Sequence, residues 1–325
     1  MWGDGARLQM EEKVMTHGDS GKTSGVGTIH RAIRMALPVL AVVLVPTIAM
    51  ASVLYTDGSV DPTTNNALKS INGTPTNKAD DIGVGKFGVS TGEASPPANV
   101  AATFSTITDA AAADGKAFRF TDADNTTRSW YNSVNNSGAS LGLNFTTAGT
   151  TIAMKFRLES ASGVDSYMGI NSGTTSTPGI ASHLFWNNST GVVKEVYRNV
   201  SGTSTATGNT YHVFRISAQY VNPNRLIKVY VDENATPVIN ITNGTAAWSN
   251  QVFNAWTFGI FGSAGTGTYV VDWIAGTDDG VFAPGTTNNF NSLVTSVLQA
   301  PEPATLGLLA LGLLLPRRRR QARQA

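Results

Sequence analysis

The stretch Thr151-Ile152-Ala153-Met154-Lys155-Phe156-Arg157-Leu158 carries a large apolar side chain at every second position. A period of two places Ile152, Met154, Phe156 and Leu158 on one face of an extended chain and their neighbours on the other. The stretch therefore predicts a β-strand with one buried face, and it points to a β fold.

A second alternating segment predicts a hairpin. Apolar residues recur at every second position from Phe214 to Tyr220, the turn cluster Asn222-Pro223-Asn224 follows, and a further apolar stretch runs from Leu226 to Val231. Because Asn and Pro favour turns, we expect 211–231 to form two antiparallel strands joined at that cluster.

Short strand-like segments separated by turn residues continue along the region from Ser52 to Ala300. No segment there is both long and periodic at 3.6 residues, and Ala110 to Ala113 is the only expected helical turn. We therefore predict an all-β fold of two packed antiparallel sheets, a sandwich or jelly roll. The further strand candidates are Ala117 to Thr121, Arg128 to Val134, Tyr167 to Asn171, His183 to Asn187, Val192 to Asn199, Pro237 to Ile241, Trp256 to Phe261 and Thr268 to Trp273.

Composition narrows the class of protein. The chain has 325 residues, no cysteine and a formal net charge of +1, from 23 Lys and Arg against 22 Asp and Glu. Without cysteine it has neither disulfides nor thiolate metal sites, so its stability must come from a packed core. No basic patch interleaved with aromatic residues lies outside the C-terminal end, which argues against a nucleic-acid partner.

The N-terminal region is typical of an export signal. An almost wholly apolar run extends from Met35 to Ala49, a basic flank around Arg31 and Arg34 precedes it, and Ala49-Met50-Ala51 follows the small-x-small pattern. These three features predict a signal peptide. We expect a signal helix, with Ala49 and Ala51 as the small residues of the cleavage site and residues 1–51 removed. An uncleaved N-terminal anchor is the alternative.

The C-terminal end predicts a short membrane segment. Pro301-Glu302-Pro303 precedes an apolar run from Ala304 to Leu315, which Arg317-Arg318-Arg319-Arg320 follows after one proline. As a helix the run spans about 18 Å, short of the ~30 Å hydrocarbon core of a bilayer. Moving each Arg through the bilayer centre costs at least about 2.5 to 3.5 kcal/mol. The Arg cluster should therefore stay in the cytoplasm and hold the rest of the chain outside the membrane.

This order of triplet, apolar run and Arg cluster resembles the PEP-CTERM sorting signal of Gram-negative and related bacteria. The resemblance implies that exosortase, a membrane-embedded transpeptidase-like enzyme, recognises Pro301, Glu302 and Pro303 and removes the tail near them. The prolines suit recognition, because Pro303 disfavours the helical conformation at Glu302. The triplet is then expected to be an extended segment that a protease groove can bind. The chain is then expected to cross the inner membrane, to be anchored transiently, and to reach the cell envelope or the medium. A plain C-terminal tail anchor is the alternative.

The central region resembles a second family. Tyr211 to Ile216, Lys228 to Glu233 and Pro237 to Ile239 are similar to central strands of concanavalin A-like and laminin-G-like jelly rolls. The segment from Tyr269 to Trp273, with Asp278 to Pro284 after it, is similar to their last strand and exit loop. The resemblance implies a module that binds glycans or serves as structure. The expected parts are a leader (1–51), a β-sandwich domain (52–284), a flexible polar linker (285–300) and the sorting signal (301–325).

No catalytic residues are predicted. Glycosidases of this fold place paired carboxylates on one face of a strand, and Glu93, Glu159, Glu195 and Glu233 are not so spaced. His183 and His212 lack a Ser or Asp at an informative spacing, although a triad assembled in space stays open. For His212, alternation with Phe214 favours a half-buried strand position.

Two ligand hypotheses concern aspartates on loops and aromatic side chains. Asp122 and Asp124 on one loop, and Asp278 and Asp279 on another, are candidate calcium ligands, although neither loop completes an EF-hand. Loop acids that cap turns are the alternative. Aromatic rings would stack on sugars if they were exposed, although tryptophans in a sandwich more often lie in the core. The rings concerned are Trp130, Tyr131, Trp186, Trp248 and Trp256.

Together these features predict an exported, exosortase-processed surface or matrix protein that binds or organises extracellular polysaccharide. A glycan-degrading enzyme of the same fold and a purely structural envelope protein are the alternatives.

Overall fold

The computed structural model describes residues 53–71, 81–89, 102–123, 129–139, 141, 148–162, 167–172, 180–221, 224–244, 255–260 and 265–298. All of them belong to the compact unit Ala49–Ala325. The expected signal helix and C-terminal membrane helix lie outside the described residues. Within those residues, no helix combines the length and the apolar character needed to cross a membrane.

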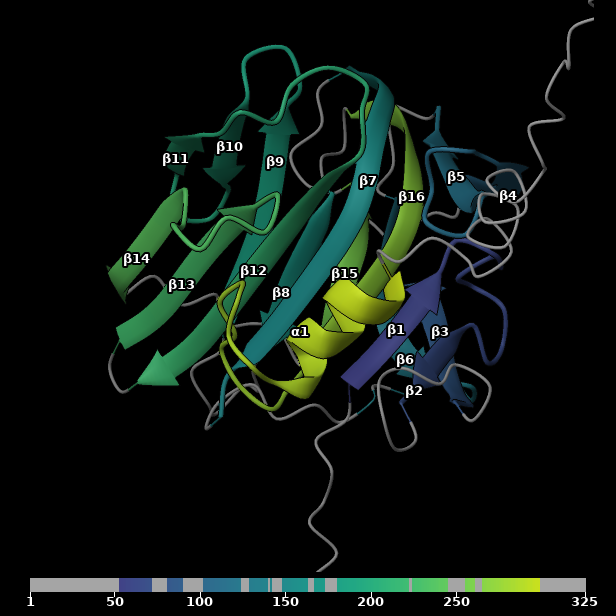
Figure 1. Ribbon diagram of the computed structural model, residues 1–325, viewed down its shortest axis with the longest axis horizontal. Helices are drawn as coiled ribbons and strands as arrows, with labels where there is room; N and C mark the ends of the chain where they lie inside the picture. Colours follow the sequence, from purple (N-terminus) through teal and green to yellow (C-terminus); the bar gives the residue numbers. More distant parts are fainter. Residues whose placement is uncertain are drawn as a thin grey trace, which may run out of the picture. The chain divides into compact units, whose positions relative to one another are not determined.

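The described chain is almost entirely β (Figure 1). Its strands are β1 (Val53–Asp57), β2 (Leu68–Ser70), β3 (Ile82–Val89), β4 (Thr103–Thr108), β5 (Lys116–Asp122), β6 (Ser129–Asn135), β7 (Thr150–Ser162), β8 (Met168–Ser172), β9 (Ile180–Asn187), β10 (Val192–Glu195), β11 (Val200–Thr203), β12 (His212–Val221), β13 (Asn224–Val231), β14 (Ile239–Gly244), β15 (Ala255–Ile260) and β16 (Thr266–Thr277). Two helical elements follow, α1 (Asn289–Leu293) and the π-helical turn η2 (Val294–Leu298).

Every strand pair in the described part is antiparallel, which confirms the predicted all-β antiparallel class. The division into two separate sheets is not confirmed, because hydrogen bonds join the strands into one network. Its main path runs β11-β10-β9-β8-β15-β6-β3-β2-β1-β16-β7-β12-β13-β14, with β5 paired to β16 and β4 to β5.

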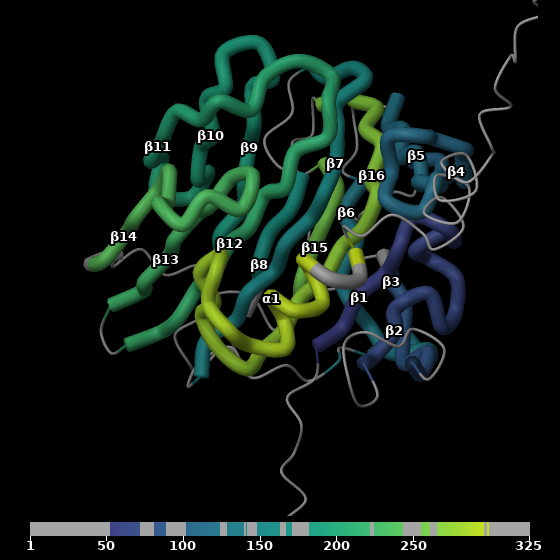
Figure 2. Tube along the Cα trace, viewed as in Figure 1, coloured from purple at the N-terminus to yellow at the C-terminus, as the bar shows by residue number. Residues whose placement is uncertain are grey.

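Strands from distant parts of this path contribute to one core. The ring of Phe156 on β7 meets that of Trp186 on β9 edge-on, with centroids 5.6 Å apart, although seven strands separate β7 from β9 along the path. Figure 2 shows β7 and β12 passing in front of β8 and β15. The network therefore folds back over a shared apolar interior, to which both halves contribute side chains.

The alternation that predicts the first strand is confirmed. In β7, Ile152, Met154, Phe156 and Leu158 are at most 1% exposed and belong to the main core. Burying a side chain of this size contributes about 1.5 to 3 kcal/mol relative to exposure. The alternate residues Lys155 and Arg157 reach the other face, where each meets a carboxylate.

The predicted hairpin also forms, with β12 paired to β13 in a register that sets Ile216 opposite Val229. After β13 the chain turns through Asp232 and Glu233, which both have positive φ, 52° and 57°. Few residues other than glycine adopt this conformation. Asp232 compensates by accepting a hydrogen bond from the Val213 backbone N–H at 3.0 Å.

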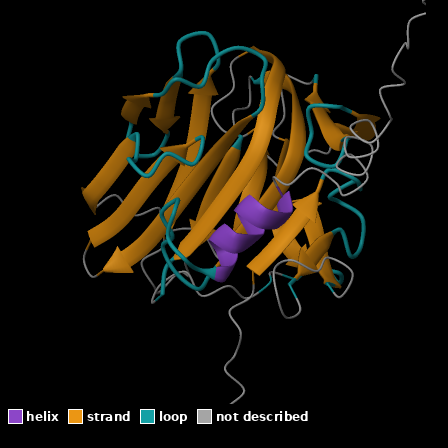
Figure 3. Ribbon diagram, viewed as in Figure 1, coloured by secondary structure: helices purple, strands orange, loops and turns teal. Residues whose placement is uncertain are grey.

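The segment after the last strand differs from the expected flexible polar linker. Here α1 and η2 cover the outer face of β1, β7, β12 and β16 (Figure 3) and form a second apolar cluster with Trp273 and Val213. We call Asn289–Leu298 the C-terminal strap. Its apolar residues Phe290, Leu293, Val294 and Leu298 are at most 1% exposed. Burial of these residues outweighs the polar composition of the flanking sequence.

Candidate functional site

The residues predicted to direct sorting lie outside the described part of the chain. These are Ala49 and Ala51 at the N-terminal end, Pro301, Glu302 and Pro303 in the triplet, and Arg317, Arg318, Arg319 and Arg320 in the cluster. The last described residue, Leu298, lies three positions before the triplet. The structure therefore describes the β domain and the C-terminal strap, and the site is sought there.

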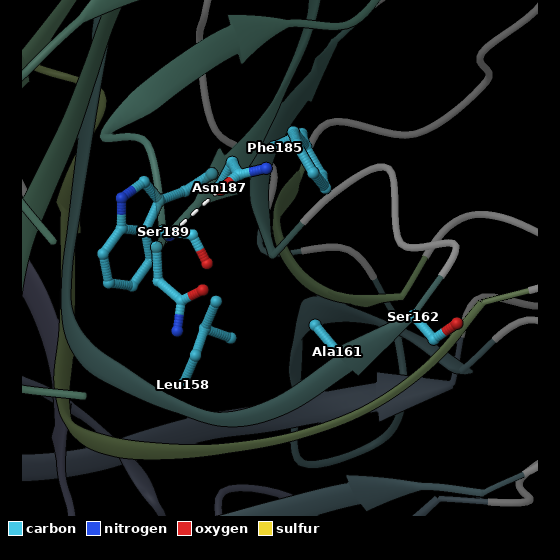
Figure 4. Close-up of a pocket in the computed structure, with 8 residues that line it drawn as sticks. Leu158, Ala161, Ser162, Phe185, Asn187 and Ser189 are labelled. Atoms are coloured by element: carbon cyan, nitrogen blue, oxygen red, sulfur yellow. Dashed lines mark hydrogen bonds between the residues drawn. The ribbon is translucent and has the colours of Figure 1, made fainter. Parts of the chain in front are cut away.

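A cleft of about 190 Å³ opens between the end of β7 and the turn that joins β9 to β10. Figure 4 shows Leu158, Ala161 and Ser162 along one side, with Phe185 and Asn187 across from them. The lining combines amides and hydroxyls with apolar surface. Its residues are Leu158, Ala161, Ser162, Phe185, Trp186, Asn187, Asn188 and Ser189.

The local sequence explains the shape of the cleft. The Asn187 carboxamide oxygen accepts hydrogen bonds from the backbone N–H groups of Ser189 at 3.0 Å and Thr190 at 3.1 Å, which is an Asx turn. Gly191 ends the turn with φ of 70°, and an added Cβ would lie 2.3 Å from the Ser204 carbonyl oxygen. The glycine is required both for its conformation and for this close approach.

Two hydrogen bonds hold the far side of the cleft. The Trp186 indole N–H donates to the Ala206 carbonyl at 3.1 Å, and the Asn188 amide donates to Asn209 Oδ1 at 3.1 Å. The cleft is therefore tied to the loop between β11 and β12. Amide and hydroxyl groups beside an apolar floor suit a ligand that has both hydroxyl edges and C–H faces.

Among the described residues, a group of linked charges lies on the outer face of β7. Asp109 Oδ2 accepts hydrogen bonds from Arg157 Nη2 at 3.0 Å and from the Tyr211 hydroxyl at 2.9 Å, and Arg157 also contacts Glu159. Glu159 pairs with Arg119 as well, at 2.9 Å. Nearby, Lys155 Nζ lies 2.6 Å from Asp272 Oδ2.

This charged group is arranged as a structural clamp. Burial acts to raise the pKa of Asp109, but hydrogen bonds from the Ala111 N–H, Arg157 and Tyr211 outweigh it and lower the pKa below the ordinary value. Burial and the bond to Asp109 raise the pKa of the Tyr211 hydroxyl far above its usual range. A carboxylate held in its charged form and a tyrosine held protonated are poorly suited to general acid and nucleophile roles.

The structure brings a threonine, a histidine and an aspartate into a chain of side-chain contacts. The spacing of these residues in the sequence does not show it. Thr210 Oγ1 lies 3.1 Å from His212 Nε2, and His212 Nδ1 lies 2.8 Å from Asp232 Oδ2. Distances of this kind are typical of a nucleophile, base and orienting acid. However, Nε2 also lies 3.2 Å from the Thr207 carbonyl oxygen. Burial acts to lower the pKa of His212, but Asp232 and this carbonyl raise it above the ordinary value. Both ring nitrogens thus face acceptors, which favours a protonated ring over a base.

His183 is fully buried, unlike His212, which is half-buried as predicted. Its Nδ1 lies 3.0 Å from the Tyr197 hydroxyl, and its ring packs at a tilt against that of Trp130, with centroids 4.4 Å apart. Because the imidazole of His183 is not exposed to solvent, its position suits a role in packing.

The hypothesis that exposed aromatic rings form a sugar-stacking platform is wrong for the described residues. Trp130, Tyr131, Trp186 and Trp256 are at most 2% exposed and fill the interior, as the alternative predicted. Trp248 lies outside the described residues. Aromatic side chains bury 150–250 Å² each, so a cysteine-free domain gains more from placing them inside.

The candidate calcium ligands that the structure describes lie at opposite ends of β16. Asp122 is buried opposite Gly267 near the start of β16, whereas half-buried Asp278 and exposed Asp279 follow its end at Thr277. At about 3.3 Å per residue these positions lie roughly 33 Å apart. Asp124 lies outside the described residues. Among the described residues, no three acidic or histidine side chains are grouped to hold a metal ion.

Comparison with known proteins identifies the C-terminal end. The chain ends in a protein-sorting signal, since residues 299–322 match the PEP-CTERM protein-sorting motif. The chain therefore carries a PEP-CTERM sorting motif, as the sequence predicts. This motif implies export, a transient C-terminal membrane anchor and processing by exosortase. No curated protein matches the chain in sequence.

Several solved structures are similar to the chain at low identity. A carbohydrate esterase from the Shiga toxin-encoding bacteriophage phi24B is 15% identical, covers 54% of this chain and 89% of its own, and has a TM-score of 0.40. The cellulose-induced protein Cip1 is 12% identical over 60% of this chain and 93% of its own, with a TM-score of 0.40. Domain 4 of an arabinanase from Geobacillus stearothermophilus, in complex with arabinotriose, is 12% identical over 77% and 100%, with a TM-score of 0.39. Similarities this loose define neither the fold nor the function of the chain.

Proposed function

We propose that the chain is an exported, exosortase-processed surface or matrix protein whose β domain, a jelly roll of the concanavalin A-like kind, binds extracellular polysaccharide without degrading it. The observation that carries the proposal is the sorting motif at 299–322 behind a domain whose cleft is lined by amides, hydroxyls and apolar surface. Sorting places the domain outside the cell, where polysaccharide is the abundant ligand with matching chemistry.

The size of the cleft supports a weak, repeated interaction. At about 190 Å³ it is smaller than the 300–1,000 Å³ of drug-sized sites and suits about one sugar ring. At about −0.3 kcal/mol per non-hydrogen atom, a ring of about eleven such atoms gains roughly 3 kcal/mol, which corresponds to a Kd of millimolar order or weaker. A polymer with many identical units compensates for this through effective concentration.

Binding by the processed protein to a panel of immobilised polysaccharides, with and without calcium, tests the proposal. Ala161→Trp should fill the cleft and abolish retention, because Ala161 is exposed at its side. Ser105→Trp on the exposed strand β4 is the matched control and should bind like the wild type. Equal retention by both variants, or none by the wild type, would contradict the proposal.

A hydrolytic role is the second candidate, because of the contacts among Thr210, His212 and Asp232. The carbonyl of Thr207 at Nε2 argues against it. Release of soluble sugar or acyl groups from the same panel, lost in His212→Gln, would establish turnover in place of simple binding.

A further inference from the structure

The first half of the C-terminal strap is held by a polar anchor. Arg215 on β12 is fully buried, and its Nη1 donates to Asn291 Oδ1 at 2.5 Å and to the Phe282 carbonyl at 3.2 Å. Its Nη2 donates to Glu233, which has positive φ. The Phe290 ring lies 5.1 Å from the guanidinium. Removing α1 would leave a buried cation short of partners, which is strongly unfavourable.

Asn291 links this anchor to the chain before the helix. Its Nδ2 donates to the carbonyls of Ala283 at 2.8 Å and Thr286 at 2.6 Å, while Asn288 caps α1 by accepting from the Asn291 N–H at 2.8 Å. The loop, the helix start and the sheet are thus joined through one side chain. We infer that α1 is a fixed part of the domain.

The second half of the strap is held differently. η2 is a π-helical turn, a rare form that occurs mostly as single turns and often at functional sites. Among its described contacts, Val294 and Leu298 pack into the apolar cluster, and the one side-chain hydrogen bond is from Thr295 to the Asn291 carbonyl at 2.8 Å. Among the described residues, η2 is therefore held mainly by apolar packing, whereas α1 is also held by the polar anchor at Arg215 and Asn291.

The turn η2 ends directly before the sorting motif. Leu298 is buried, and the matched motif begins at the next residue. Three residues, from Leu298 to Pro301, span at most about 11 Å when extended. A domain of this size has a radius of gyration of about 17 Å. With Leu298 docked, the triplet therefore cannot move far from the body of the domain.

The prolines of the triplet favour an extended chain, and the apolar run that is predicted to enter the membrane begins at Ala304. An enzyme in the membrane that holds the triplet in a groove must accommodate residues on its N-terminal side too. Beyond two residues, those positions belong to η2.

We propose that η2 is a release turn, docked in the folded precursor and unwound when exosortase engages Pro301-Glu302-Pro303, so that docking of Leu298 slows processing. The inference rests on the exosortase processing in the proposed function. The apparent rate of cleavage then scales with the fraction of precursor in which η2 is unwound.

Pulse-chase measurement of cleavage tests the inference on the full chain in a host that contains exosortase. Inserting Gly-Ser-Gly-Ser directly after Leu298 frees the triplet without unwinding η2, and should raise the cleavage rate by about tenfold if the released state makes up about a tenth of the precursor. Leu298→Ala should raise it as well, by weakening the docking. The same four residues inserted after Gly138, in the exposed loop after β6 and outside the strap and its contacts, lengthen the chain equally and should leave the rate unchanged.

Equal rates for the two insertions, whether raised or not, would overturn the release turn. A wild-type chain that is never cut would overturn the proposed function, and this inference with it. The two failures are thus distinguishable in one experiment.

Discussion

Replacing Phe290 by alanine should destabilise the whole domain, although composition alone places this residue in a linker. Phe290 is fully buried, stacks on Phe282 with centroids 6.5 Å apart, and covers the Arg215 guanidinium at 5.1 Å. Truncating a buried phenylalanine costs about 3 to 5 kcal/mol, from lost transfer free energy and from the cavity left behind.

Thermal unfolding of the processed protein measures this loss. For a domain of 150–250 residues each kcal/mol shifts Tm by about 2–4 °C, so a loss near 4 kcal/mol lowers Tm by about 8–16 °C. Val281→Ala, at a position 42% exposed in the same segment, is the control and should change stability by less than about 0.5 kcal/mol. If Phe290→Ala shifted Tm no more than this control, the strap would not be part of the packed domain.

Two further predictions concern the domain. Gly276→Ala should destabilise it by about 1 to 3 kcal/mol in urea unfolding, because the added Cβ would lie 2.6 Å from the Trp256 indole, and wild-type stability would show that the ring has room to move. Because Asp232 and the Thr207 carbonyl raise the pKa of His212, its stabilising contribution is complete below its unfolded pKa of about 6.5 and is lost as pH rises through the folded value. The Tm advantage of the wild type over His212→Gln should therefore shrink from pH 6 to pH 8, and an advantage that grew with pH would mean that the ring is not held protonated.

The strands could be predicted from sequence because their signal is local. The alternation in β7 and the turn cluster after β12 lie within a few residues of the structure they specify. Pairing of β16 with β1, β5 and β7 joins residues far apart in the chain, so no short pattern shows it. The continuous strand network depends on these distant pairs.

The strap carried a signal that composition concealed. Phe290, Leu293, Val294 and Leu298 follow the i, i+3, i+4, i+8 spacing of a helix with one apolar face, and Asn288 before them is a favoured cap. The polar run that begins at Gly285 favoured a linker instead. The spacing of these four apolar residues is the local signal that indicates the helix.

The candidate cleft was beyond sequence reasoning. Leu158 and Ser162 at the end of β7 meet the turn at Asn187 only because β9 folds over the same core. The contact between His212 and Asp232 likewise depends on the register of β12 and β13. The buried tryptophans, in contrast, follow from the need of a cysteine-free domain for a large core.

The intact mass of the protein released by a host with exosortase tests the central claim. This claim is that the β domain is exported and that both ends of the chain are removed. We predict a mature form that begins at Ser52 and lacks Arg317 to Ala325, with an uncut precursor accumulating in the inner membrane when Pro301, Glu302 and Pro303 are replaced by alanine. A released protein that still carries Arg317 to Ala325 would contradict the account.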